Sequence, residues 1–212
     1  MKAAALLFFA VTAGVAAEPR ITFIKSFPAS TPAYESVSVQ RSGALIYKEA
    51  VNDQQPLSAQ LQDSDTQQLF QMAEKLNYFR EPLESGLKVA NTGKKTFRYE
   101  DEKGTASQTE FNYSLNVVAQ QLLEKLEEIA SSERAYLDLD RSARYDKLGV
   151  NDALASIESL WLRKQLAAPV QFVPLLNRIA THETYMHMAR DRAARLRDTF
   201  QALSTPKAAE QH

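Results

Sequence analysis

The stretch YESVSVQRSGALIY, residues 34–47, constrains the fold more than any other part of the chain. Apolar residues alternate with polar ones on both sides of a turn that contains Gly43. These apolar residues are Val37, Val39, Leu45 and Tyr47. Alternation with a period of two around a glycine turn predicts a β-hairpin. We expect this hairpin to organise a sheet with one buried face.

Other segments extend the sheet. Residues 20–27 alternate weakly and predict a first strand. Residues 95–113 predict a second hairpin, whose polar turn ends at Gly104. Residues 49–62 are polar and are expected to form a connection, and residues 80–93 a long loop. One strand and two hairpins give an antiparallel sheet of about five strands.

Two helices are expected to cover this sheet. Apolar residues recur at spacings of three and four over 64–77 and again over 115–129. Ser64 with Gln67 forms a predicted capping box for the first helix, and Ser114 is the predicted N-cap of the second. The order of elements predicts an α+β domain over residues 18–131, with both helices on one sheet face.

The C-terminal part of the chain has a different composition. Residues 132–203 are rich in charge, yet apolar residues keep helical spacing throughout. This pattern predicts an α-helical region, built as a helical hairpin or a three-helix appendage. The last helix is either continuous or broken near Thr181. Residues 204–212 are small and polar and predict a disordered tail.

The first 17 residues have the features of a signal peptide. Lys2 precedes an apolar run over 3–15, and small residues stand before a predicted cleavage after Ala17. A run of about 13 apolar residues is too short for a bilayer, which needs about 20. We therefore expect a periplasmic or secreted protein that is not transmembrane after cleavage.

Composition excludes several kinds of chemistry. The chain has no cysteine, which removes disulfides, thiolate nucleophiles and cysteine-based zinc sites. The formal net charge of −1 gives no general attraction to nucleic acid. Residues 86–96, GLKVANTGKKT, resemble a phosphate-binding loop but have six residues between the glycines where four are required. No cofactor is expected.

The histidines offer the only candidate metal ligands. His182, Glu183 and His187 lie close together in the sequence. The two histidines are five residues apart, roughly 140° around a helix, whereas a metalloprotease helix needs a spacing of four. Glu183 and His187 have that spacing, but a third ligand is not evident. His182 lies on the apolar stripe and is expected to be a core histidine, so no metal site is expected.

No catalytic nucleophile is recognisable. A Gly-x-Ser-x-Gly elbow is absent from the sequence, and carboxylate pairs such as Asp138 and Asp140 suit solvated faces. The sequence leaves open a catalytic Ser/Lys pair, although no motif points to one. A possible interaction surface consists of Arg190, Arg192, Arg195 and Arg197. These cations either complement the C-terminal dipole of their helix or bind an anionic envelope surface.

The N-terminal half contains a spaced pattern made of Phe23, Ser26, Pro28, Pro32, Tyr34, Ser42, Gly43 and Tyr47. This pattern resembles a family of uncharacterised bacterial exported proteins, and the stretch over 145–151 resembles the C-terminal part of such proteins. Relatives of this kind often have a cysteine in the Pro-bounded loop, where this chain has Ser30 and Thr31. The family implies no activity.

These observations favour a non-catalytic binding or interaction module of the bacterial envelope. Its partner would be an unidentified protein or envelope component, and its oligomeric state stays open. One alternative is a periplasmic hydrolase with a cleft between the sheet and the helical region. Another is an inhibitor or assembly factor that presents the hairpin edge or loop 80–93.

Overall fold

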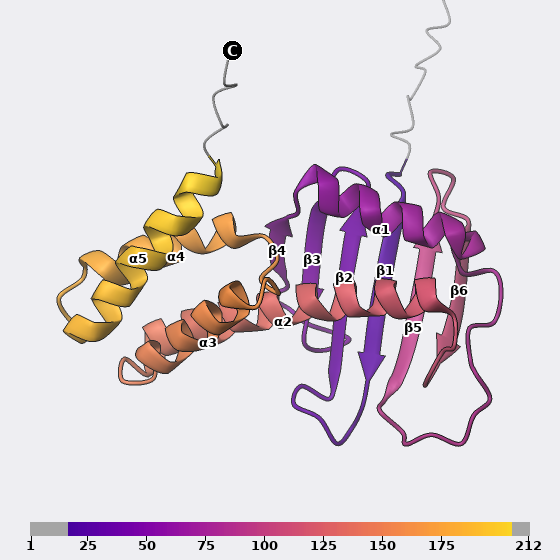
Figure 1. Cartoon of the computed structure of the whole chain (residues 1–212), viewed down its shortest axis with the longest axis horizontal. Helices are drawn as coiled ribbons and strands as arrows, with labels where there is room; N and C mark the ends of the chain where they lie inside the picture. The colour runs from indigo at the N-terminus through magenta and orange to yellow at the C-terminus, as the bar shows by residue number, and fades with distance from the viewer. Residues whose placement is uncertain (1–16, 205–212) are drawn as a thin grey trace, which may run out of the picture.

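The computed structural model describes residues 17–204 (Figure 1). The predicted signal peptide and the predicted tail therefore lie almost entirely outside the described residues. Within them the chain forms an α+β fold, with an antiparallel sheet followed by a helical region. This confirms the predicted fold class.

The sheet has six strands in the order β4-β3-β2-β1-β5-β6. The strands are β1 Arg20–Ser26, β2 Tyr34–Gln40, β3 Ala44–Lys48, β4 Leu57–Gln60, β5 Lys94–Glu100 and β6 Ala106–Phe111. The prediction of about five strands missed β4, which lies in the segment expected to be a connection. This four-residue strand is recruited by pairing with β3, in the register Leu45 to Ala59 and Tyr47 to Leu57.

The predicted hairpin is confirmed as β2 and β3. Val37 pairs with Tyr47 and Val39 with Leu45, and all four side chains are buried. Gly43 closes the turn with a φ of +85°. A Cβ atom there would lie 2.9 Å from the carbonyl oxygen of Leu61, so the turn needs glycine for its conformation and for its space.

Helices α1 (Asp63–Lys75) and α2 (Val117–Tyr145) cover the same face of the sheet and lie across its strands (Figure 1). Both predicted caps were wrong. Ser64 lies inside α1, which begins one residue earlier and has no side-chain cap. Asn116 caps α2, since its Oδ1 accepts hydrogen bonds from the N–H groups of Val118 and Ala119.

Aromatic side chains dominate the core between the sheet and these helices. Phe97 is fully buried, and its ring lies 5.0 to 6.1 Å from three other rings. These rings belong to Phe23, Phe79 in the short 3₁₀ segment η1 (Asn77–Phe79), and Phe111. Phe23, Phe97 and Phe111 therefore mark the face of β1, β5 and β6 that is turned toward the core.

Helix α2 continues beyond the sheet and joins it to the helical region (Figure 1). The region contains α3 (Val150–Leu162), the 3₁₀ segment η2 (Pro169–Phe172), α4 (Val173–Thr181) and α5 (His187–Ser204). The sequence left open whether the last helix is continuous or broken near Thr181, and the structure has the break. These helices and the C-terminal half of α2 enclose a second cluster of buried side chains. The predicted boundary at residues 131 and 132 falls inside α2.

The connection from α3 to η2 crosses α2 at Ser132 and Glu133, both fully buried. The Ser132 hydroxyl accepts a hydrogen bond from the N–H of Ala167 at 2.8 Å, and Glu133 Oε1 accepts one from Gln171 Nε2 at 2.8 Å. These bonds fasten the helical region to the middle of α2. Among residues 17–204, no helix combines the length and the apolar character needed to span a bilayer.

Candidate functional site

A row of charged side chains crosses three adjacent strands beneath α2. Glu35 on β2 pairs in register with Lys25 on β1, and Lys25 pairs with Lys95 on β5. Residues directly opposite on paired strands share a face. The buried apolar residues Phe23, Val37 and Phe97 lie two positions away along the same strands. The charged row is therefore the end of the covered face, beside the β1–β2 loop and loop 80–93.

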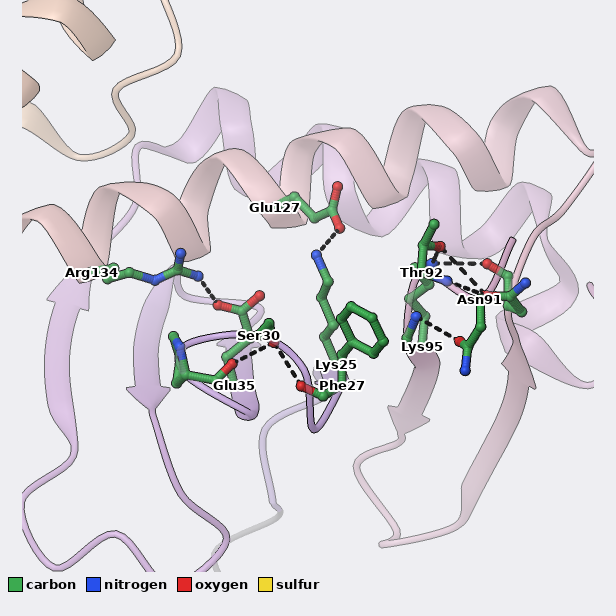
Figure 2. A network of polar contacts seen from close by, with 12 residues as sticks. Lys25, Phe27, Ser30, Glu35, Asn91, Thr92, Lys95, Glu127 and Arg134 are labelled. Carbon is green, nitrogen blue, oxygen red and sulfur yellow. Dashed lines mark hydrogen bonds and ion pairs between the residues drawn. The ribbon is translucent and has the colours of Figure 1, made fainter. Parts of the chain in front are cut away.

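Helix α2 supplies charges that match part of this row (Figure 2). Lys25 Nζ lies 2.8 Å from Glu127 Oε1, and the Arg134 guanidinium donates to the Glu35 carboxylate. Glu127 and Arg134 are seven residues apart, two turns of helix, so both face the sheet. These two ion pairs leave Lys95 as the member of the row without a carboxylate partner.

The Lys95 ammonium is buried among neutral acceptors (Figure 2). The residue is 4% exposed, and its Nζ donates to Thr92 Oγ1 at 2.5 Å and to the carbonyl oxygen of Asn112 at 2.8 Å. Burial lowers the pKa of Lys95, and the charge of Lys25 acts in the same direction, whereas Glu127 opposes them. The site therefore contains a desolvated cation that lacks a direct counter-ion.

Lys95 lines a cleft of about 460 Å³ between the sheet and α2, which extends to the helical region. This volume lies within the usual range for small-molecule sites. Most of the lining residues are polar. They are Lys25, Thr92, Asn112, Tyr113, Ser114, Gln120, Glu124, Glu127, Glu128, Ser131 and Gln165, with Phe111, Leu123 and Leu160 as the apolar contribution.

Asn112 fixes the wall of the cleft that loop 80–93 provides. Its Oδ1 accepts from the N–H of Thr92 at 3.0 Å, and its Nδ2 donates to the carbonyl oxygen of Ala90 at 3.0 Å. Its own N–H donates to the carboxylate of Glu84 at 2.6 Å, and this bond lowers the pKa of Glu84. The side chain of Asn112 thus holds the loop at two points and its backbone N–H at a third, while its backbone carbonyl oxygen orients Lys95.

The predicted metal candidates lie elsewhere, in and beside the break between α4 and α5. His182 is exposed because α4 ends at Thr181, so its assignment as a core histidine was wrong. Its Nδ1 lies 3.0 Å from Thr184 Oγ1, while His187 Nδ1 lies 2.9 Å from Asp191 Oδ2. Glu183 is also exposed. Residues 17–204 contain no group of three or more potential metal-ligating side chains.

The four arginines of α5 do not gather on one surface. Arg190 and Arg197 turn toward α4, where they donate to the Ala180 carbonyl oxygen at 3.4 Å and to Asn177 Oδ1 at 3.1 Å. Arg192 turns toward α3 instead.

Arg192 forms an ion pair with Glu158 at 3.1 Å and donates to Asn151 Oδ1 at 2.6 Å. Arg195 is exposed. Three of the four cations therefore tie α5 to its neighbours, which is a structural task.

Comparisons with protein-family models, with curated proteins and with solved structures find no match for this chain. The resemblance to exported proteins therefore stays a prediction. Ser30, in the Pro-bounded loop, donates to the carbonyl oxygens of Phe27 at 2.8 Å and Pro32 at 2.7 Å (Figure 2). In this chain Ser30 closes the β1–β2 loop.

Sequence reasoning missed Lys95 as a site residue, although a signal for it exists. Lys25 follows Phe23 by two residues, and Lys95 precedes Phe97 by two. Both lysines therefore occupy the buried register of their strands. A lysine in such a register is seldom fully buried unless it is paired, so it marks a position with a special environment.

Proposed function

We propose that the protein is a non-catalytic binding module of the bacterial envelope, and that the cleft beside Lys95 holds a small polar ligand with an anionic group. One observation carries this proposal: the ammonium of Lys95 is buried with two neutral acceptors and no carboxylate. A carboxylate or phosphate oxygen of the ligand supplies the missing charge.

The energetics favour such a ligand. Removing a cation from water costs several kcal/mol, and neutral acceptors recover only part of this cost. An anion placed against Lys95 forms a charge-assisted hydrogen bond, which is about twice as strong as a neutral one. Hydroxyl and amide groups from Ser114, Gln120 and Gln165 complete a polar lining for the rest of the ligand.

Titration with small anions tests the proposal. Acetate and inorganic phosphate, added at constant ionic strength, are expected to shift the NMR amide signals of Thr92 and Asn112 saturably. Lys95→Met is expected to abolish these shifts. Lys103→Met, at an exposed lysine in the β5–β6 turn, is the matched control and is expected to retain them.

The variant also reports on folding. Since Lys95→Met replaces an unpaired buried cation with an apolar chain, its thermal stability is expected to equal or exceed that of the wild type. Anion binding that is equally strong in the wild type and in folded Lys95→Met would refute the proposal. Binding lost equally in Lys103→Met would refute it as well.

Hydrolysis is a second candidate function, favoured by one contact. The 2.5 Å separation between Lys95 Nζ and Thr92 Oγ1 matches a nucleophile beside a base. This role requires neutral Lys95, whereas anion binding requires the ammonium. Turnover of p-nitrophenyl acetate distinguishes the two functions. Binding without turnover supports the module, and turnover that disappears in Thr92→Ala supports the hydrolase.

A further inference from the structure

A second cleft adjoins the one at Lys95. It has a volume of about 670 Å³ and lies between α2 and α3. Ser131 on α2 and Leu160 on α3 line both clefts. The two clefts are therefore neighbours that meet at this pair of residues, and together they follow α2 from the sheet into the helical region.

The length of this path sets the size of an occupant. The α2 residues that line it run from Gln120 to Ser142. This distance corresponds to about 33 Å along an α-helix. An extended peptide advances about 3.3 Å per residue, so the path has room for up to about ten residues.

The charges along the path favour a peptide over other linear polymers. Positive groups are Lys25, Lys95, Arg134 and Arg163, and negative groups are Glu124, Glu127, Glu128, Asp138 and Asp152. Lys25 is already paired with Glu127, and Arg134 with Glu35. Nucleic acid is disfavoured because the carboxylates repel its phosphates. The hydroxyl groups of a neutral glycan can form hydrogen bonds with these side chains, but a neutral glycan places no negative charge against Lys95. A peptide offers a backbone with donors and acceptors, a terminal carboxylate and side chains of both signs.

We infer that the ligand of the proposed binding function is a linear peptide with a free C-terminal carboxylate. The carboxylate lies against Lys95, and the chain passes between Ser131 and Leu160 into the second cleft. This inference rests on the proposed function, because it assigns the anionic group to a peptide end. It goes beyond the proposed function by assigning the rest of the peptide to the second cleft, which the proposed function does not use.

A length series tests it. The probes are Ala-Ala and a decapeptide of alternating Ala, Lys and Glu ending in Ala-Ala, each as free acid and as C-terminal amide. Isothermal titration is expected to give at least about tenfold tighter binding for the decapeptide acid, equivalent to about 1.4 kcal/mol. Both amides are expected to bind more weakly than the acids.

Two variants separate the clefts. Ser131→Trp fills their junction, and Arg163→Ala removes an exposed cation from the second cleft. Each is expected to lose the advantage of the decapeptide. Arg163→Ala, which lies outside the first cleft, is also expected to bind Ala-Ala as the wild type does. Arg195→Ala, at an exposed arginine that lines neither cleft, is the matched control and is expected to change nothing.

The outcomes distinguish the two proposals. Equal affinity for both free acids, with Lys95-dependent binding of Ala-Ala, overturns the peptide inference and leaves the proposed function intact. Absence of anion binding at Lys95 overturns both. Tighter binding of an uncharged chitin tetrasaccharide than of the decapeptide overturns the inference in favour of a glycan. If Ser131→Trp does not fold, Arg163→Ala decides the question.

Discussion

Glu133 carries a buried carboxyl group at the point where the helical region is fastened to α2. The residue is 0% exposed. Its Oε1 accepts a hydrogen bond from Gln171, and its Oε2 is buried without a hydrogen-bond partner. Burial raises the pKa of Glu133 from 4.5 to about 7, while the bond from Gln171 opposes this rise. We predict that stability depends on pH through this residue.

The sign and size follow from linkage. In the unfolded chain the carboxyl group ionises near pH 4.5, whereas in the folded chain it stays protonated up to about pH 7. The stability present below pH 4.5 is therefore lost as the pH rises through 7. The difference between the two pKa values corresponds to about 3 kcal/mol. Glu133→Gln keeps the shape of the side chain and removes the charge, so it removes this loss.

Urea unfolding followed by circular dichroism at pH 4.5 and pH 8.5 measures the effect. Relative to Glu133→Gln, the wild type is expected to lose about 3 kcal/mol between these two pH values. Glu124→Gln, at an exposed position of the same helix, is the matched control and is expected to change little. If the wild type and Glu133→Gln differ by the same amount at both pH values, burial does not govern this carboxyl group and the reasoning fails.

Three further predictions concern the scaffold of the site. Phe97→Ala is expected to lose about 3–5 kcal/mol in urea unfolding, because it leaves a cavity among three aromatic rings; a loss below 1 kcal/mol contradicts this. Both Gly43 and Gly104 have a positive φ, but a Cβ atom would meet neighbouring atoms only at Gly43. Gly104→Ala is therefore expected to lose about 1 kcal/mol of stability and Gly43→Ala about 3 kcal/mol. Equal losses in the two variants contradict the argument. Asn112→Ala removes the two side-chain hydrogen bonds to Thr92 and Ala90, so limited proteolysis of residues 88–92 is expected to become faster; unchanged cleavage contradicts this.

The sheet shows where sequence patterns suffice. The β2–β3 hairpin was predicted correctly, because its alternation is long and its turn contains a glycine with positive φ. Strand β4 was missed, because its four residues are only half-buried or exposed and carry little apolar signal. Its formation depends on the free edge of β3, and local sequence does not encode that edge.

The helical caps show a second limit. Ser64 and Ser114 have side chains that suit an N-cap, yet α1 begins one residue before Ser64 and α2 begins three residues after Ser114. Cap preferences are worth about 1 kcal/mol. Burial of the apolar faces of these helices is worth more, so packing against the sheet decided where each helix begins.

The sequence by itself determined the α+β class, the two hairpins, the two covering helices and the helical region, because hydrophobic periodicity is a local property of the chain. Only the tertiary structure decided the candidate site. Lys25, Lys95 and Glu127 come from segments up to about 100 residues apart, and their meeting depends on strand order and register. The tertiary structure also decided which lysine is paired: Glu127 forms its ion pair with Lys25, and Lys95 is left with two neutral acceptors.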